Sequence, residues 1–354
     1  MAAQRSPQLP LEVILTIADF LQPSDLLNLL QTIPQIAPLL NYRHIQARDE
    51  NNHTLLYLIV EQGLDNLIQP LTKFIPQSCT LYNEGWTPLH QAIGNANQRM
   101  VKALIYAGAD LSAQDEGGKT ALHLACKENA IEIVQCLLDH GANPSAVDHS
   151  QRTPLHEACG QNTTILRIVT KAGEDLNPRR LPRELTPLHH ETMLARESLI
   201  RILLEAGADP SIPTETGETI LHRAALMNHA NIVRLLLEFG VDIAVRNGHG
   251  CTPFLVAAIG GSDECLQFLL KAGADISDLD NHGRNALHIA AWAGQESSVR
   301  LLLKLGLDSS ARDKRGHTPM CWAAKYEQTG VVQILEDAQK NRFARLINRV
   351  RGKS

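Results

Sequence analysis

The sequence has few aromatic residues, no excess of positive charge and no long uncharged apolar run. Aromatic residues make up 4% of the 354 positions and hydrophobic residues 44%, a balance that favours packed Leu- and Ala-rich helices over sheets. The formal net charge is -5, so we expect no nucleic-acid partner. Charged residues interrupt the N-terminal segment, and no apolar stretch reaches the roughly 18 residues of a membrane span. We therefore expect an intracellular protein, cytoplasmic or nuclear, that does not bind membranes.

Motifs of catalysis and metal binding are also lacking. The seven cysteines show no CxxC spacing, and Cys126 and Cys159 recur at equivalent positions, as small buried residues in a reducing compartment do. Neither a P-loop nor an HExxH or GxSxG motif is present. We expect no enzyme activity, no cofactor and no bound metal.

An internal repeat dominates the sequence. Thr-Pro-Leu-His occurs at 87–90, 153–156 and 186–189, and variants of it begin at other positions with the same spacing. Successive units start 33 residues apart, at positions 54, 87, 120, 153, 186, 219, 252, 285 and 318. In period and motif each unit resembles the ankyrin repeat. The resemblance implies an all-α ankyrin-repeat solenoid over residues 54–338, made of nine helix-turn-helix units with short β-turn fingers.

The residue types within one unit explain why it should fold in this way. Thr is a good helix N-cap, and Pro is favoured at the first helical position because its missing N–H costs nothing there. Ala pairs such as Ala224 and Ala225 allow close helix packing, and a Gly such as Gly240 ends the second helix. The motif histidines recur with the repeat, so we expect them to bond turn backbone between units rather than to bind metal: His90, His123, His156, His189, His222 and His288.

The repeat is interrupted at one junction. The unit that starts at Thr153 is one residue short before Gly173, and the longer connection that follows carries Arg179, Arg180 and Arg183. Neutral drift in a loop and contact with an acidic partner are both open explanations for this junction.

A basic segment follows the last unit. Residues 339–354 carry apolar residues at helical spacing among arginines, which predicts an amphipathic helix that covers the end of the stack. A membrane-surface or nuclear-import role is the alternative.

Residues 1–50 lie outside the repeat. Pro23 and Pro34 divide them into three short apolar helices, a unit too small to be stable alone. Leu-Pro-Leu-Glu-Val at 9–13, Phe-Leu at 20–21 and Asp-Leu-Leu-Asn-Leu at 25–29 resemble an F-box over residues 9–44. The chain as a whole is similar to fungal-type proteins in which an F-box precedes ankyrin repeats.

The F-box resemblance implies a function. Proteins of that family bind the Skp-type adaptor of a cullin-RING (SCF-type) ubiquitin ligase, while the rest of the chain holds the substrate. It implies that adaptor contacts are made or shaped by Leu9, Pro10, Ile14, Ile17, Leu26 and Leu27. The alternative is a scaffold or regulatory protein in which these helices only cap the first repeat.

The ankyrin resemblance implies where a protein partner binds. In such stacks the concave face is lined by turn residues and by the residues seven and eight positions after each Thr. These are polar in the units starting at 87, 120 and 153, whereas the next five units present apolar groups: Met193, Leu194, Leu226, Met227, Ile259, Trp292 and Tyr326. Arg183 and Arg284 belong to a mostly basic rim beside them. We expect this face to bind a protein whose identity the sequence leaves open.

Overall fold

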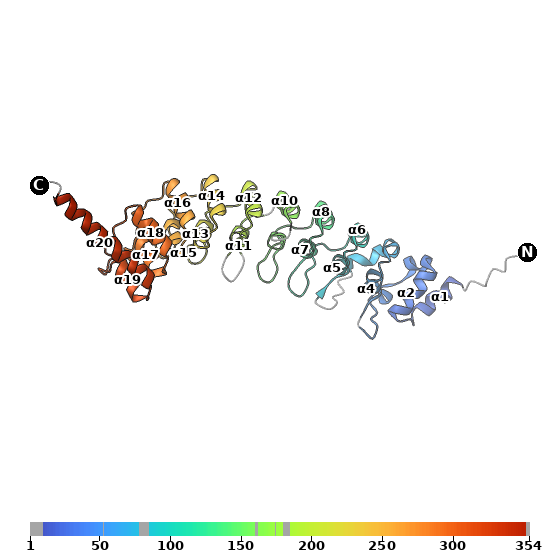
Figure 1. Ribbon diagram of the computed structural model, residues 1–354. Coiled ribbons are helices and arrows are strands. Elements are labelled where there is room, and N and C mark those ends of the chain that lie inside the picture. The colour runs from blue at the N-terminus through green and yellow to red at the C-terminus, as the bar shows by residue number, and fades with distance from the viewer. Residues whose placement is uncertain are drawn as a thin grey trace, which may run out of the picture. The chain divides into compact units, whose positions relative to one another are not determined.

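The computed structural model describes residues 10–51, 53–77, 85–159, 162–173, 175–179 and 185–351 (Figure 1). The chain divides into two compact units, Met1–Pro178 (unit 1) and Arg179–Ser354 (unit 2). Every regular element in the described residues is a helix, so the predicted all-α fold is confirmed. Isolated bridges between Arg48 and Thr54 and between Gln114 and Thr120 each close a single turn.

The first helix of each repeat, the inner helix, begins directly after the motif Thr. Thr87 has an extended backbone, its side chain accepts the N–H of His90, and Pro88 is the first helical residue, as the sequence predicts. The inner helices of unit 1 are α4 (Leu55–Glu61), α5 (Pro88–Gly94), α7 (Ala121–Lys127) and α9 (Pro154–Ala158). Those of unit 2 are α11 (Pro187–Met193), α13 (Ile220–Leu226), α15 (Pro253–Gly260), α17 (Ala286–Ala293) and α19 (Pro319–Lys325).

The second, outer helix of each repeat packs its apolar face on the inner helices. In α14 (Ala230–Glu238) the residues at helical spacing, Ile232, Val233, Leu235 and Leu236, are buried. The other outer helices are α6 (Gln98–Tyr106), α8 (Ile131–Asp139), α10 (Thr163–Lys171), α12 (Glu197–Glu205), α16 (Asp263–Lys271), α18 (Glu296–Lys304) and α20 (Thr329–Arg351). They lie along one side of each unit and the inner helices along the other (Figure 1).

In six repeats the turn before the inner helix is closed by an acidic or amide side chain five positions before the motif residue: Asp49, Asp115, Asp148, Asn247, Asp280 and Asp313. Asp280 Oδ1 accepts the N–H groups of His282 and Arg284, both at 2.9 Å. Asp313 does the same for Arg315 and His317, at 2.9 and 2.8 Å. These bonds satisfy turn backbone that has no helical partner, which keeps the fingers ordered.

Five motif histidines tie their inner helix to the next turn. His222 Nδ1 accepts the N–H of Thr219 at 3.2 Å, so the ring proton sits on Nε2, which donates to Cys251 O at 3.0 Å. The same bond to the next turn is made by His90, His123, His189 and His288. The predicted bond to the next turn is confirmed for these five of the six histidines, and His156 does not share it. Burial lowers the pKa of all five, to about 4 for His189, so they are neutral near pH 7.

The first repeat, which starts at Thr54, departs from the predicted helix-turn-helix. After α4 the chain forms two 3-10 segments, η2 (Asp65–Leu67) and η3 (Gln69–Gln77), in place of an outer α-helix. Pro70 and Pro76 explain the difference, because neither can donate the backbone hydrogen bond that an α-helix interior requires. Leu67, Ile68 and Leu71 are nevertheless buried, so the segment covers the inner helices as an outer helix would.

The N-terminal residues continue the stack of unit 1. They form α1 (Leu11–Ala18), α2 (Pro23–Thr32), η1 (Pro34–Leu39) and α3 (Tyr42–Gln46). Helix α2 packs on α4 and η1 packs on η3, so this pair occupies the place of one further, atypical repeat. The predicted short helices are therefore present, but part of the expected helical length is 3-10, and the module is packed on the first repeat.

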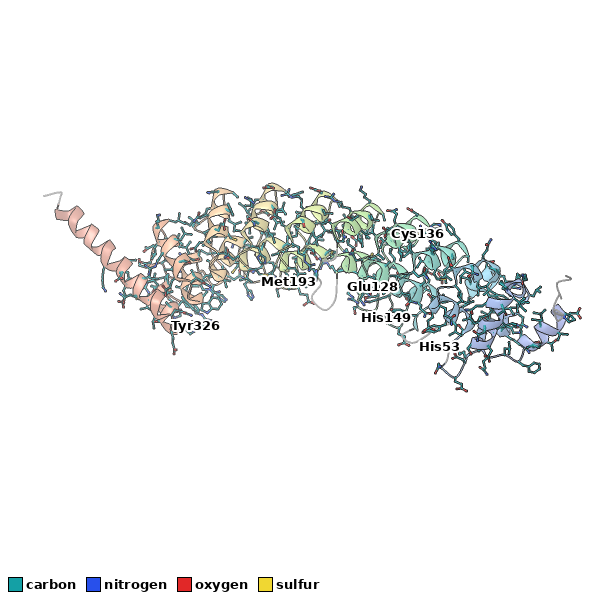
Figure 2. The ribbon with its side chains drawn as sticks, turned by 45° about the vertical axis from the view of Figure 1, so that its right-hand side comes forward. His53, Glu128, Cys136, His149, Met193 and Tyr326 are labelled. Atoms are coloured by element: carbon teal, nitrogen blue, oxygen red, sulfur yellow. The ribbon has the colours of Figure 1, made fainter. Side chains whose placement is uncertain are left out.

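The C-terminal basic segment does not form a helix of its own. Residues 329–351 form the single helix α20, so the basic segment continues the outer helix of the last repeat; no Pro or Gly interrupts the chain at 339. Its last turns extend away from α18 and α19 in both views (Figures 1 and 2). Among the described helices, none has the length and apolar character needed to cross a bilayer.

Candidate protein-binding surface

The predicted partner-binding residues of unit 2 lie at equivalent positions on five neighbouring inner helices. We call them the apolar row: Met193, Leu194, Leu226, Met227, Ile259, Trp292 and Tyr326. Each lies in the last turn of its helix or directly after it. Leu194, Met227 and Tyr326 are 47%, 41% and 46% exposed, and the other four are half-buried. Met193 and Tyr326 lie on the same side of unit 2, opposite the outer helices (Figure 2).

The backbone explains why these side chains reach the surface. Each inner helix of unit 2 is followed by a residue with positive φ, such as Asn228 at 58° and Gly261 at 68°, so the chain turns sharply toward the outer helix. The two preceding side chains are left without a following helical turn to cover them. Neighbouring helix ends are also bonded to one another. Ser262 Oγ donates to Ala225 O at 2.8 Å, and Gln295 Nε2 donates to Ile259 O at 2.9 Å.

The C-terminal end of the row is an aromatic cluster. The Trp292 and Tyr326 rings meet edge to face with centroids 6.0 Å apart, and Tyr326 stacks on Trp322 at 6.1 Å with planes 15° apart. The Trp322 Nε1–H donates to Asp313 Oδ2 at 2.9 Å, which fixes the ring against the finger of its own repeat. We call Trp292, Trp322 and Tyr326 the aromatic platform.

Sequence reasoning missed Trp322. It lies four positions after Thr318, where the other repeats carry unrelated residues such as Gln91, His190 and Val256. The fold does not require a particular residue at this variable position. A tryptophan there was therefore a signal of a binding surface that the sequence did contain. The structure places it beside two residues that were predicted.

The two predicted rim arginines have different outcomes. Arg284 Nε donates to Asp280 Oδ2 at 2.7 Å, and Nη2 lies 2.7 Å from the same oxygen. Its guanidinium carbon lies 5.9 Å from the Trp292 ring centroid and 5.3 Å from that of Trp322, so the structure brings Arg284 and the aromatic platform together. Arg183 lies outside the described residues.

The same positions in unit 1 are polar. Lys127 and Glu128 form an exposed ion pair with a 3.8 Å separation, which contributes little to stability. Gly94 lies under Trp86, and a Cβ atom there would come within 2.7 Å of that ring. Gly160 and Gln161 lie outside the described residues. The apolar row is therefore a feature of unit 2.

The predicted adaptor-binding residues are divided between surface and core. Ile17 is 42% exposed and Pro10 is exposed, whereas Leu26 and Leu27 are each 1% exposed because they pack under α4. Ile14 is also buried, and Leu9 lies outside the described residues. Three of the six residues thus belong to the core at this end of unit 1 and are not accessible to an adaptor. Val13 and Phe20, which were not predicted, are 41% and 85% exposed beside Ile17.

Comparison with known families and structures identifies the repeats. Family models described as ankyrin repeats (3 copies) match residues 27–115, 97–180, 240–313 and 278–344, and a second model, ankyrin repeats (many copies), matches 203–257. The chain belongs to the ankyrin-repeat family. Its ankyrin match begins at residue 27, within α2, in agreement with the packing of α2 on α4. No F-box model matches residues 9–44.

A solved ankyrin structure has a similar fold. The chain resembles the crystal structure of the ankyrin repeat domain of Bcl-3, described as a unique member of the IkappaB protein family, with 28% sequence identity and a TM-score of 0.58. The match covers 63% of this chain and all of that one. No curated protein matches the sequence. The ankyrin fold is an interaction module, so this chain is a protein–protein interaction adaptor.

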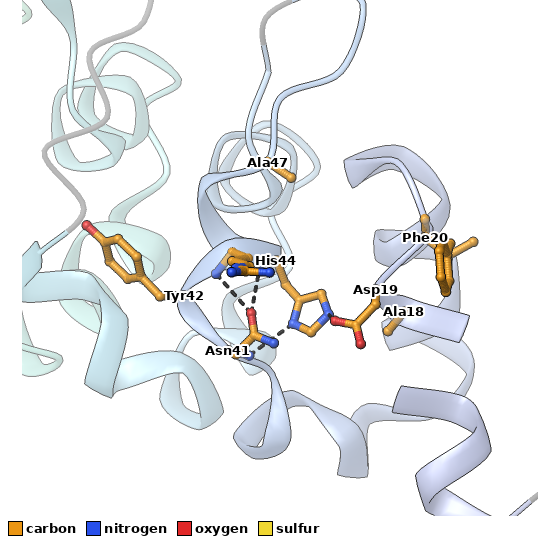
Figure 3. A pocket seen from close by; sticks show the side chains of 9 residues that line it. Ala18, Asp19, Phe20, Asn41, Tyr42, His44 and Ala47 are labelled. Atoms are coloured by element: carbon orange, nitrogen blue, oxygen red, sulfur yellow. Dashed lines mark hydrogen bonds and ion pairs between the residues drawn. The ribbon is translucent and has the colours of Figure 1, made fainter. Parts of the chain in front are cut away.

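One pocket lies at the N-terminal end of the ankyrin stack. It encloses about 720 Å³ and is lined by Ala18, Asp19, Phe20, Leu21, Asn41, Tyr42, Arg43, His44 and Ala47 (Figure 3). Asn41 Oδ1 accepts the backbone N–H groups of Arg43 and His44 and so caps α3. The Asn41 backbone N–H donates to His44 Nδ1 at 3.0 Å, and His44 Nε2 lies 2.9 Å from Asp19 Oδ1. This contact joins the end of α1 to α3. Among the described residues, no group of three His, Cys, Asp or Glu side chains is arranged to hold a metal.

Proposed function

We propose that the chain holds a protein partner on the apolar row of unit 2. The observation that supports this is a row of large apolar side chains, three exposed and four half-buried, at two repeated positions at the ends of five neighbouring inner helices. Met and aromatic residues at such positions are enriched in interfaces, because they bury much area at small conformational cost. The fixed spacing of the helix ends, through Ser262 and Gln295, supplies a surface that is already ordered before a partner binds.

Met227→Asp and Trp292→Ala are expected to weaken partner capture by more than about 1 kcal/mol each, in the range of interface hot spots. Phe239→Asp is the matched control. Phe239 is 39% exposed and Met227 41%, but Phe239 follows the outer helix α14 of the same repeat, on the other side of the unit. Quantitative affinity purification from cells, with mass spectrometry, measures the effect. Partners lost from Met227→Asp and kept by Phe239→Asp support the proposal; equal recovery from both variants contradicts it.

We further propose that the chain is a substrate-recognition subunit of a cullin-RING (SCF-type) ubiquitin ligase, with the N-terminal module docking the Skp-type adaptor and the ankyrin concave face binding the target. The sequence resemblance and the exposed apolar side chains of Val13, Ile17 and Phe20 support this finer function. The scaffold alternative, in which these helices only cap the stack, is favoured by the packing of α2 on α4. Leu26 and Leu27 cannot decide between the two, because an Asp at either buried position would unfold the module.

Binding of the recombinant Skp-type adaptor to the full chain decides this question. Ile17→Asp and Phe20→Asp should each weaken it about tenfold or more, since each places a charge in an apolar contact. Gln35→Asp, at an exposed position of η1, is the control and should bind as the wild type does. No measurable binding of the wild type by calorimetry, or equal binding of all three variants, would sink the ubiquitin-ligase function and leave the scaffold.

A further inference from the structure

The aromatic platform combines neutral ring surface with positive charge, which specifies the chemistry of its partner. Arg284 lies against two indole rings, and Lys325 Nζ lies 5.3 Å from the Trp322 ring centroid and 5.7 Å from that of Tyr326. The cations are held where a peptide stacking on the rings would meet them. An interface that offers both features selects for an apolar anchor next to negative charge.

The positive charge here is only partly compensated by nearby acids. Five cationic side chains lie on the fingers and inner helices around the platform: Arg284, Arg312, Lys314, Arg315 and Lys325. Asp280 and Asp313 are 5% and 7% exposed and already bonded to turn backbone, and Asp280 also pairs with Arg284. Glu327, directly after Tyr326, is exposed, so five cations stand against three carboxylates. A net charge of -5 for the whole chain makes this local excess a property of one surface.

The cationic side chains differ in how far they are already bonded within the protein. Arg284 uses Nε and Nη2 with Asp280, which leaves Nη1 outside that ion pair. Lys325 is exposed and forms no ion pair with the described acidic residues. Lys314 Nζ donates to Asn281 O at 2.8 Å, and Arg312 Nη1 donates to Gly316 O at 2.8 Å, so these two brace the last finger. Lys325 and Arg284 Nη1 are therefore the groups best placed to meet a partner carboxylate.

The ring orientation is fixed before binding. The Asp313 carboxylate that accepts the Trp322 N–H is buried, and burial raises its pKa; the N–H groups of His317, Trp322 and Arg315 outweigh this and hold its pKa below the ordinary range. Asp313 thus stays ionised near pH 7 and keeps Trp322 in place. A preordered ring surface costs little entropy on binding.

We propose that this end of the apolar row binds an acidic peptide segment that carries an aromatic or aliphatic anchor. The anchor stacks on the aromatic platform, and the acidic side chains pair with Lys325 and Arg284. The proposal rests on the function proposed above and names the partner class for the same surface. A single-stranded nucleic acid would also find rings and cations here, but the row continues through Met227 and Leu194, which suit apolar side chains rather than phosphates.

Selection from a random peptide library displayed on phage, with the full chain as bait, tests the proposal. The enriched peptides are expected to be acidic and to contain an aromatic or large aliphatic residue, and their affinity should fall as salt is raised. Enrichment of basic or uncharged peptides, no enrichment, or tighter binding of a single-stranded DNA oligonucleotide than of any selected peptide would overturn it.

Lys325→Glu provides the site-specific arm. It reverses an exposed charge beside the platform and should weaken the selected acidic peptide about tenfold or more by fluorescence anisotropy. Lys304→Glu makes the same charge change at an exposed position of the outer helix α18, and should bind within about twofold of the wild type. Equal losses in both variants would mean that overall charge, and not this surface, holds the peptide, and would also overturn the proposal.

The outcomes separate the two proposals. If the peptide arms fail while Met227→Asp and Trp292→Ala still lose their cellular partners, the row binds a partner of another chemistry. If those two variants also retain their partners, the proposed function fails with the peptide class. A far-ultraviolet circular dichroism melt of each variant confirms that the fold is intact.

Discussion

Acidification from about pH 7 to about pH 4.5 is expected to lower the free energy of unfolding by several kcal/mol, mainly through the motif histidines. His90, His123, His189, His222 and His288 are buried, with lowered pKa values and a neutral ring that holds two turns together. Burial is the largest cause of the shift at each of them. In the unfolded chain the histidines have a pKa near 6.5. As the pH falls, the unfolded state therefore takes up these protons before the folded state does.

The sign of the effect follows from that order. Since the folded pKa of each histidine lies below the unfolded one, its contribution is fully present above about pH 6.5 and is lost as the pH falls toward the folded value. Within that window each histidine adds a slope of up to about 1.4 kcal/mol per pH unit. For His189, with a pKa of about 4, the whole contribution amounts to about 3 kcal/mol.

Urea unfolding followed by circular dichroism at a series of pH values measures this slope. His189→Gln is the informative variant, because it removes one titrating ring, and the slope should fall by up to about 1.4 kcal/mol per pH unit. The loss of the hydrogen bond to Glu218 O should also cost about 1 kcal/mol near neutral pH. A stability that is flat from neutral pH down to about pH 5 would contradict the account of the histidines.

A second large effect is expected from Ala257→Glu, which should destabilise unit 2 by about 3 to 5 kcal/mol. Ala257 is 0% exposed and lies five positions after Thr252, where α13, α15 and α17 pack closely. In the repeat that starts at Thr186, the equivalent residue Glu191 faces His190 and Arg196. In this repeat the positions of those two cations are taken by Val256 and Ser262, so neither could pair with the new carboxylate. The new carboxylate would be buried without a partner and would also force the helices apart.

The equivalent position in α11 already carries a glutamate. Glu191 is 0% exposed; His190 Nδ1 lies 2.9 Å from its Oε1, and Arg196 Nη1 lies 3.7 Å from its Oε2, beyond hydrogen-bond range. Because this pairing is incomplete, Glu191→Ala should leave the free energy of unfolding within about 1 kcal/mol of the wild type or raise it. Thermal unfolding of both variants measures the contrast. A loss of several kcal/mol on Glu191→Ala would show that Glu191 stabilises its repeat.

The repeat made much of the fold predictable. Thr, Pro, Ala and Gly recur at fixed positions of the 33-residue repeat, because each of these positions has its own backbone or packing requirement. The inner and outer helices of unit 2 could therefore be located from the repeat spacing alone. The first outer segment did not follow, because Pro70 and Pro76 override an apolar pattern that still serves to cover the core. At the C-terminus, the pattern of residues 339–354 indicated a helix correctly but could not indicate that it continues α20.

The candidate surface was predictable in part. Position along the repeat placed Met227, Trp292 and Tyr326 at helix ends, whereas the burial of Leu26 and Leu27 depends on α4 packing over them, which the pattern of α2 alone does not contain. Arg284 was expected as a rim residue; its place against two indoles depends on Trp322, which belongs to the next repeat. The 33-residue period alone does not predict such side-chain contacts between neighbouring repeats.

Site-specific photo-crosslinking shows on which side of unit 2 a partner binds. A benzophenone side chain placed at Met227, at the end of an inner helix, and at Phe239, after the outer helix of the same repeat, compares the two sides of unit 2 in living cells. Binding on the apolar row predicts a covalent partner adduct from position 227 and none from position 239. An adduct from position 239 alone would contradict it and place the partner on the outer helices.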